Sequence, residues 1–224
     1  MPVLDPIYAG TYDSQVQNTS TTAWATARGG SATNGNSVYG NEVESSDFGV
    51  YNAYTGARGT NTFYCRRSYF PFDVSGVEGT LDSATIKIYM ENLGDTGDEA
   101  EVQLREATAL ANTAADFGNA WHHGTLLGDQ IAPKEEPPAS AAYVTFTLGT
   151  SGLSVLEGEM GSSTMVVGLM GFKYDVTSSS APSLNGDLTK VKVYYSDHST
   201  SAFHPRLDIT VKATGNSVFF GANF

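Results

Sequence analysis

The sequence lacks most of the features that mark secreted and membrane-spanning proteins. Its 224 residues include a single cysteine, Cys65, so no disulfide forms within the chain. The first residues, MPVLDPIYAGTYDSQ, have neither the basic start nor the apolar core of a secretory signal. No stretch approaches the roughly 18 continuous apolar residues of a membrane helix. We therefore expect a protein that is made in the cytoplasm and has no membrane partner.

Positive charge is scarce as well. The 12 Lys and Arg residues are outnumbered by 24 Asp and Glu residues, and the formal net charge is -12. A chain this acidic is repelled by phosphate groups, which argues against nucleic acid and anionic membranes as partners. High acidity by itself is typical of a soluble surface protein and assigns no activity.

Catalytic motifs are also missing. No G-x-S-x-G motif occurs, and Cys65 falls in an alternating segment, where a cysteine packs like a small hydrophobic residue. The adjacent His122 and His123 would point to opposite faces of a strand, although in a loop both could reach one metal ion. His198 and His204 lie in another loop, without a Glu-x-x-His or cysteine partner. We predict a protein without enzymatic activity and without a cofactor.

Alternation of apolar and polar residues is the dominant pattern that is present. In residues 84–92, for example, Ile86 and Ile88 share one face and Lys87 and Tyr89 share the other. A period of two is typical of half-buried antiparallel strands. Residues 164–171 are apolar throughout, which indicates a central strand. The other alternating runs are EAEVQLREA, YVTFTLGT, TKVKVYYS and RLDITVKA.

Turn signals separate these runs, namely GDTGD, KEEPP and LNGD. The helical candidates are two short segments, residues 105–118 and residues 151–160. Many short strands divided by turns predict an all-β fold, an antiparallel β-sandwich of the jelly-roll type.

The stretch RRSYFPFDVSG, residues 66–76, runs two arginines into a block of aromatic residues. We interpret it as a strand with core aromatics, followed by a turn at DVSG. Pro71 has no amide hydrogen to donate, which predicts a sheet edge or a bulge. The arginines are expected to pair with acids on the polar face. One face would carry Ser68, Phe70, Phe72 and Val74, and the other Arg67, Tyr69, Pro71 and Asp73.

We divide the chain into an N-terminal arm (1–44), a sandwich (45–213) and a C-terminal tail (214–224). Residues 14–47 are polar and rich in glycine, and we expect a long ordered loop there. The tail carries Phe219, Phe220 and Phe224. Three aromatics near a chain end predict docking, either on the same domain or on a neighbouring subunit or coat protein.

Two further groups of residues are candidates for ligand binding. Asp95, Asp98, Glu99 and Glu101 surround two glycines and offer carboxylates to a calcium ion, or form a solvated acidic turn. Trp24 and Trp121 are candidates for stacking on sugars, or for packing in the core.

The segment RSYFPFDVSGVEGTLDSATIKIYM resembles the DNRLRE-type jelly-roll domain, in which an arginine leads an apolar strand that is followed by Phe-Asp-Leu-Ser and SATLRLY. The segments FKYDVTSS and VYYSDHSTSAFHPRLDITV look like its closing strands, and the resemblance spans residues 45–213. The chain departs from the family at Pro71, which replaces a basic residue, and at SGLSVLEGEM, which replaces a helix led by tryptophan. The resemblance implies a jelly-roll module of extracellular and phage surface proteins, similar to carbohydrate-binding jelly rolls. The matching positions in the first segment are Arg67, Phe70, Phe72, Asp73, Ser75, Ser83, Ala84, Thr85 and Tyr89.

Together these features lead us to expect a virion structural protein of a bacteriophage that is released by lysis of the host. It would decorate or cement a capsid or belong to a head appendage, with coat or other virion proteins as partners and a homotrimer as the oligomer. The alternative is a carbohydrate-binding or receptor-binding adhesin module with a glycan partner. An enzyme that cleaves glycans is the third hypothesis.

Overall fold

The computed structural model describes residues 3–10, 13–20, 23–29, 37–40, 44–48, 50–54, 61–93, 101–107, 121–122, 125–126, 129–177, 181–182 and 191–212. The strands are β1 (Ile7–Tyr8), β2 (Ser14–Ser20), β3 (Ser37–Gly40), β4 (Glu44–Phe48), β5 (Val50–Tyr54), β6 (Asn61–Asp73), β7 (Leu81–Asn92), β8 (Val102–Ala107), β9 (Trp121–His122), β10 (Thr125–Leu126), β11 (Ala142–Thr147), β12 (Thr164–Gly171), β13 (Val191–Tyr194) and β14 (Arg206–Val211). The helical elements are α1 (Trp24–Gly29), α2 (Thr150–Glu159), the π-helix η3 (Phe172–Val176) and the 3-10 turn η4 (Ser201–Phe203).

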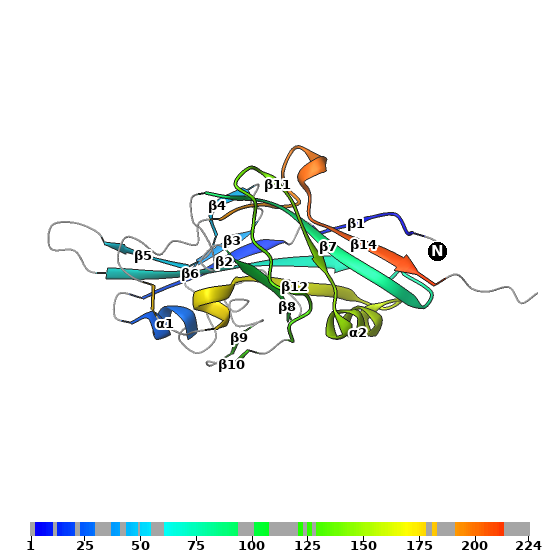
Figure 1. Cartoon of the computed structure of the whole chain (residues 1–224), viewed down its shortest axis with the longest axis horizontal. Coiled ribbons are helices and arrows are strands. Elements are labelled where there is room, and N and C mark those ends of the chain that lie inside the picture. Colours follow the sequence, from blue (N-terminus) through cyan, green and yellow to red (C-terminus); the bar gives the residue numbers. More distant parts are fainter. Residues whose placement is uncertain are drawn as a thin grey trace, which may run out of the picture.

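Two antiparallel sheets face each other, as Figure 1 shows. We call them sheet I, with β1, β4, β7, β11, β13 and β14, and sheet II, with β2, β3, β5, β6, β8 and β12. The main core lies between them and takes Ile86 and Ile88 from sheet I and Phe70, Phe72 and Val167 from sheet II. Removal of these apolar side chains from water is the main driving force that holds such layers together. The predicted antiparallel β-sandwich is confirmed.

The middle of sheet II is buried on both faces, along residues 67–72 of β6 and residues 165–171 of β12. Beyond the main core, a second cluster forms between its far face, α1 and η3, and contains Trp24, Cys65, Tyr69 and Tyr174. The alternation that we expected along β6 is present, because Phe70 and Phe72 join the main core and Tyr69 joins the second cluster. The face that we expected to be polar is therefore a second core.

Arg67 lies inside this second cluster with no exposed surface. Its Nε and Nη2 atoms each donate to the carboxylate of Asp175, at 2.8 Å and 2.8 Å. Nη2 also donates to the carbonyl of Arg28 at 2.8 Å, and Arg28 Nε donates to the carbonyl of Asp175 at 2.7 Å. Arg67 does pair with an acid, but the pair is buried behind sheet II and not on an exposed face.

Pro71 lies in an interior strand, at a point where one of the two neighbouring strands has already ended. β6 lies between β2 and β12, and Pro71 is opposite Val166 of β12. On the other side, the pairing of β2 with β6 ends at Ser14 and Tyr69, and the Pro71 carbonyl accepts a hydrogen bond from Gly10 at 2.8 Å. In an antiparallel strand the amide and carbonyl of one residue point the same way. The missing amide hydrogen therefore points beyond the end of β2, where no ladder bond is required.

The N-terminal segment differs from the loop that we expected over residues 14–47. β2 pairs along seven residues of β6, and α1 follows it directly. β2 did not look like a strand because its sequence, SQVQNTS, is almost entirely polar. Two of its buried polar side chains have identified partners. Asn18 Nδ2 donates to the carbonyls of Thr26 and Ala27 at 2.9 Å and 2.8 Å, and Gln17 Oε1 accepts from Arg66 Nε at 2.5 Å. The described part of the arm is built into both sheets, because β1 pairs with β14.

The helical predictions had different outcomes. α2 confirms the candidate at residues 151–160. Residues 105–107 of the other candidate belong to β8, and its remainder lies outside the described residues. Among the helices that the structure describes, none is both long and apolar enough to span a bilayer.

One edge of β7 is shared by two strands in succession. β13 pairs with residues 90–92 of β7, and β14 pairs with residues 81–87. The chain leaves the sheet between them and returns at Pro205. We call residues 196–204 the flap. It projects above sheet I as the orange segment in Figure 1.

Candidate attachment face on sheet I

The outer face of sheet I is the solvent side of the sandwich, and alternation decides which side chains it carries. β7 buries Ile86, Ile88 and Met90, so Lys87 and Tyr89 point outward. By the same alternation, three other strands direct side chains to this side: Tyr143 of β11, Lys192 and Tyr194 of β13, and Arg206 and Asp208 of β14. Strand register places Tyr143 directly opposite Tyr89, and Arg206 directly opposite Lys87.

Aromatic rings meet at one end of this face. The ring of Tyr89 stacks on Phe203 of the flap, with ring centres 4.3 Å apart and planes inclined by 16°. Tyr143 and Tyr194 approach Tyr89 edge-on, each at 5.2 Å. Edge-to-face and stacked pairs of this kind add about 0.5–1.5 kcal/mol each beyond simple burial. We call Tyr89, Tyr143, Tyr194 and Phe203 the tyrosine platform.

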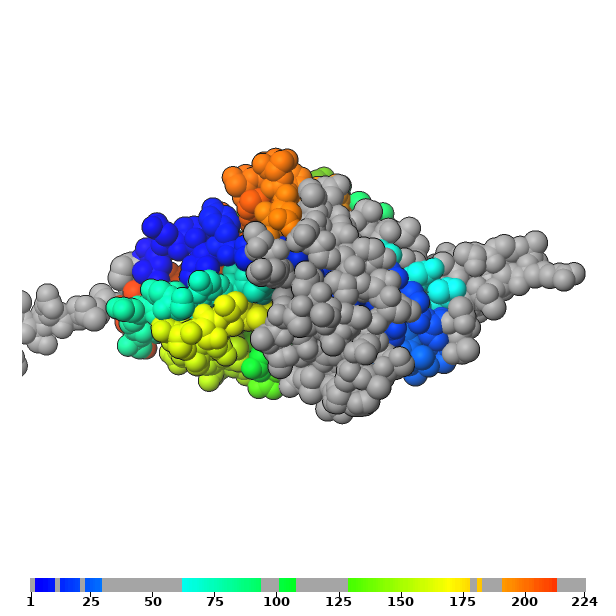
Figure 2. All heavy atoms as spheres, turned by 180° about the vertical axis from the view of Figure 1, so that it is seen from behind, coloured from blue at the N-terminus to red at the C-terminus, as the bar shows by residue number. Residues whose placement is uncertain are grey.

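The flap is held on the platform by hydrogen bonds as well as by rings. Tyr143 Oη donates to the carbonyl of His204 at 3.0 Å. The His204 ring nitrogen lies 2.6 Å from the carbonyl of His198, and the His198 ring packs on Tyr194 at 5.3 Å. Figure 2 shows the flap as an orange ridge beside the dark blue N-terminal segment. Tyr194 is only 7% exposed, so the flap limits access to the platform.

Basic side chains border the platform. Arg206 lies over the ring of Tyr143 at 4.8 Å, and Lys192 lies over the ring of Tyr194 at 4.9 Å. Lys87 pairs with Asp208 at 2.8 Å, and Arg206 approaches the same carboxylate at 3.5 Å. Burial raises the pKa of the Tyr143 hydroxyl, and the positive charge of Arg206 only partly offsets this. Tyr143 therefore remains a neutral hydrogen-bond donor over the physiological range.

This arrangement is suited to binding a surface. Flat rings beside cations and hydroxyl groups provide stacking and hydrogen bonding for a sugar or for a protein side chain. In the described part of the chain, no group of three or more His, Cys, Asp or Glu side chains is placed to hold a metal ion.

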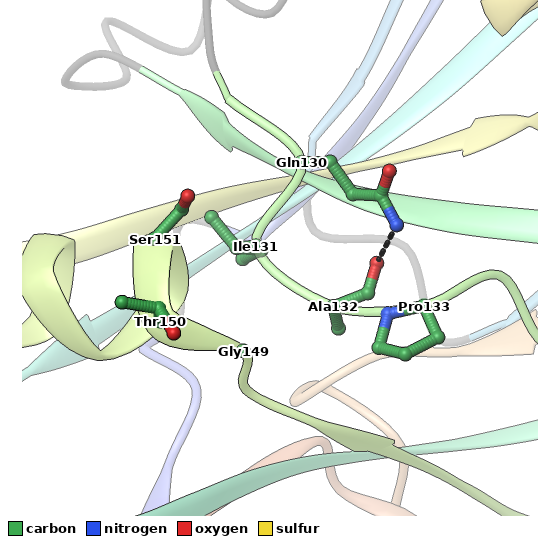
Figure 3. Close-up of a pocket in the computed structure, with 7 residues that line it drawn as sticks. All are labelled: Gln130, Ile131, Ala132, Pro133, Gly149, Thr150 and Ser151. Carbon is green, nitrogen blue, oxygen red and sulfur yellow. Dashed lines mark hydrogen bonds between the residues drawn. The ribbon is translucent and has the colours of Figure 1, made fainter.

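A hollow of about 220 Å³ lies at the start of α2 and is a weaker candidate. Figure 3 shows residues 130–133 beside Gly149, Thr150 and Ser151, with Gln130 Nε2 donating to the carbonyl of Ala132. Its lining residues carry no charged side chain. It offers neither the rings nor the cations of the tyrosine platform.

The residues predicted from sequence lie elsewhere. Trp24 is 7% exposed and packs on Phe63 in the second cluster, so its ring presents no open face to a sugar. Trp121 begins β9, but its side chain lies outside the described residues, as do Asp95, Asp98 and Glu99. Glu101 is described and pairs with Lys134. The tail residues Phe219, Phe220 and Phe224 also lie outside the described residues.

The tyrosine platform was missed by the sequence analysis, although part of the signal was visible. Tyr89 and Tyr194 occupy outward positions of alternating strands, where polar residues are usual. The pattern alone does not show that these positions are neighbours, because the register between distant strands is needed for that. Phe203, in a polar loop, gave no signal.

Comparisons with known proteins do not assign this chain to a family. No family model matches it, and no curated protein matches it. A similar solved structure is the CBM22-1 xylan-binding domain from Paenibacillus barcinonensis Xyn10C, with a TM-score of 0.31 and 8% sequence identity. The alignment covers 76% of this chain and 87% of that domain. Similarity at this level identifies no shared ligand. The description of the chain as a two-sheet antiparallel β-sandwich rests on the pairing of its own strands.

Proposed function

We propose that the chain is a non-catalytic structural protein of a bacteriophage particle that attaches to its partner through the tyrosine platform. The platform is the observation that carries this proposal. Half-buried rings bordered by Lys and Arg stand out on a protein with a net charge of -12. Aromatic residues and arginine are the side chains that contribute most at protein interfaces. The acidic composition and the single cysteine are compatible with assembly in a reducing cytoplasm.

The partner in this proposal is a coat protein or another virion protein, and the homotrimer remains a prediction. The first test separates a lysate by density and quantifies the chain in each fraction by mass spectrometry. Recovery of the chain with phage heads, at a fixed ratio to coat protein, supports a decorating subunit. Recovery with tails alone supports an adhesin. Recovery only in the soluble fraction contradicts the virion proposal.

The second test places the contact on the platform. Tyr89→Ala should weaken binding to coat shells by at least about tenfold, because a central aromatic anchor contributes about 2 kcal/mol or more at an interface. Thr147→Ala is the matched control, since Thr147 points outward from β11 on the same face and is exposed. Equal losses for both variants, or none for Tyr89→Ala, would show that attachment occurs elsewhere.

The platform also favours a second candidate, a carbohydrate-binding module. Tyr143 with Arg206 over its ring provides a hydrogen-bonding and stacking pair of the kind that holds a sugar. A glycan array followed by calorimetry distinguishes the two candidates. Saturable glycan binding that Tyr143→Ala abolishes would establish the module, whereas binding to coat shells alone would establish the structural protein.

A further inference from the structure

Both ends of the flap are fastened by the same N-terminal segment. Ala9 donates its amide to the carbonyl of Pro205 at 2.9 Å, directly after the flap. At the other end, Ser196 donates its amide to one oxygen of the Asp13 carboxyl at 2.6 Å and its hydroxyl to the other at 2.8 Å. The hydroxyl of Ser196 also lies 3.1 Å from the carbonyl of Gly10. Asp13 thus fixes the point at which the flap leaves the sheet.

The surroundings of Asp13 are unusual for a carboxylate. Its side chain has no exposed surface. Among the described residues, the charge that acts on Asp13 is that of the Asp197 carboxylate, which has the same sign. One oxygen of Asp197 is itself buried without a hydrogen-bond partner in the described structure. No described cation acts on Asp13, so its buried carboxyl faces a neighbour of the same charge without a compensating partner.

We propose that the contact between Asp13 and Ser196 is a pH-dependent latch, which holds the flap closed over Tyr89 and Tyr194 while Asp13 is protonated. The physical reason is that a neutral carboxyl tolerates burial beside Asp197, whereas a charged carboxyl does not. A protonated Asp13 still accepts the Ser196 amide with one oxygen. Its hydroxyl then donates to the Ser196 hydroxyl, which in turn donates to the Gly10 carbonyl.

The acid–base properties of Asp13 agree with this geometry. Burial raises its pKa to about 7 from the ordinary 3.8, Asp197 adds to the effect, and the hydrogen bonds from Ser196 only partly oppose it. An open flap would return Asp13 to water and to its ordinary pKa. The closed state therefore binds a proton that the open state has released between about pH 4 and pH 7. Raising the pH across this interval favours opening, by up to about tenfold per pH unit for one proton.

Two histidines in the flap make contacts that do not involve Asp13. The His198 Nδ1 atom accepts the amide of Thr200 at 3.0 Å, and the His204 ring contacts the His198 carbonyl. The variant His198→Asn therefore changes the flap's own contacts without changing the Asp13 carboxyl, and it serves as a control for the latch.

The consequence for partner binding rests on the proposed function, but the latch itself does not. Opening the flap would uncover Tyr89 and Tyr194, so attachment through the platform should strengthen from about pH 5 to about pH 7. The latch is tested on the isolated protein without any partner. Its failure is therefore distinguishable from failure of the attachment proposal.

The test is hydrogen–deuterium exchange of the flap amides from about pH 5 to about pH 8, corrected for the intrinsic exchange rate. Wild-type protection of residues 196–204 should fall up to about pH 7 and then level off, while protection of β12 stays constant. Asp13→Asn, which mimics the neutral carboxyl, should abolish the fall. Asp82→Asn, at an exposed carboxyl, and His198→Asn should both retain it. Flap protection that rises with pH, or a fall that persists in Asp13→Asn, would overturn the latch.

A second measurement keeps the proposal testable if Asp13→Asn does not fold. An NMR titration of the Asp13 carboxyl carbon in the wild-type protein should give a midpoint near about pH 7, and a midpoint near about pH 4 would overturn the proposal. The exchange experiment is repeated with EDTA, where the same profile is expected. Loss of the pH dependence in EDTA would show that a metal ion, and not a proton, accompanies Asp13, which also overturns the latch.

Discussion

Arg67 and Asp175 are 108 residues apart in the chain and form a two-pronged ion pair in which neither side chain has exposed surface. Burial opposes the charge on Arg67, but the neighbouring carboxylate outweighs it and raises the pKa of the guanidinium. The pair joins β6 to η3 across the far side of sheet II. It replaces the apolar contacts that usually close a core.

Removing one partner of this pair should strongly destabilise the folded protein. Arg67→Met leaves the Asp175 carboxylate buried without its main partner, and we expect a loss of about 3–5 kcal/mol in the free energy of unfolding. The double variant Arg67→Met with Asp175→Leu should be more stable than Arg67→Met alone, because no unpaired charge remains. Urea denaturation monitored by circular dichroism measures both. A loss below about 1 kcal/mol for Arg67→Met would contradict this interpretation.

The glycines of α2 should respond in opposite directions to alanine. A methyl group at Gly152 would lie 2.3 Å from the carbonyl oxygen of Ile131, which is backbone and cannot rotate away. We expect Gly152→Ala to destabilise the protein by about 1–3 kcal/mol through overpacking. Gly158 has open space around it, so Gly158→Ala should be neutral or stabilise the helix by up to about 1 kcal/mol. Thermal melts of the two variants give the comparison, and similar shifts for both would show that α2 does not approach Ile131 so closely.

Cys65 should be unreactive while the protein is folded. It has no exposed surface, and burial, followed by the charge of Asp175, raises the pKa of its thiol. The thiolate is the reactive form, so a chromogenic disulfide reagent at about pH 8 should react at least about 100-fold more slowly with the native protein than with the urea-unfolded chain. Complete labelling of the native protein at the unfolded rate would place Cys65 at an accessible position instead.

Asp13 should also affect the pH dependence of global stability. Its raised pKa means that the folded protein retains a proton that the unfolded chain has lost, so its contribution is fully present below about pH 4 and is lost as the pH rises to about 7. The shift corresponds to at most about 4 kcal/mol. The free energy of unfolding of Asp13→Asn, relative to wild type, should therefore increase from about pH 4 to about pH 8. A constant difference over this range would mean that Asp13 has an ordinary pKa when folded.

The sequence predicted the strands whose two faces differ in polarity. Ile86 and Ile88 against Lys87 and Tyr89 identified β7, and the turn at DVSG is present, with Asp73 Oδ1 accepting the amide of Ser75 at 3.0 Å. β2 was missed because its sequence is polar, and the partners of its buried Gln17 and Asn18 side chains are brought near only by folding. Asp175 was missed as the partner of Arg67 for the same reason. A local pattern contains no information about a contact 108 residues away.

The candidate site shows the same limit. Outward tyrosines on separate strands were visible, but their convergence depends on register and on a flap that the alternation does not describe. Trp24 and Trp121 were predicted either to stack on sugars or to pack in the core. Trp24 proved to serve the packing of the second cluster.

The break between β13 and β14 makes the flap a position where the length of the chain is free to change. Each strand takes its register from its own part of β7, so neither depends on the segment that joins them. Tyr195 and Pro205 are buried on either side of the flap, and Phe203 belongs to the tyrosine platform, so the exchangeable part is the exposed tip, residues 199–202. A longer or grafted peptide at this tip would alter the outer surface without displacing a core residue or Phe203. The sandwich therefore has a natural display site directly beside the tyrosine platform.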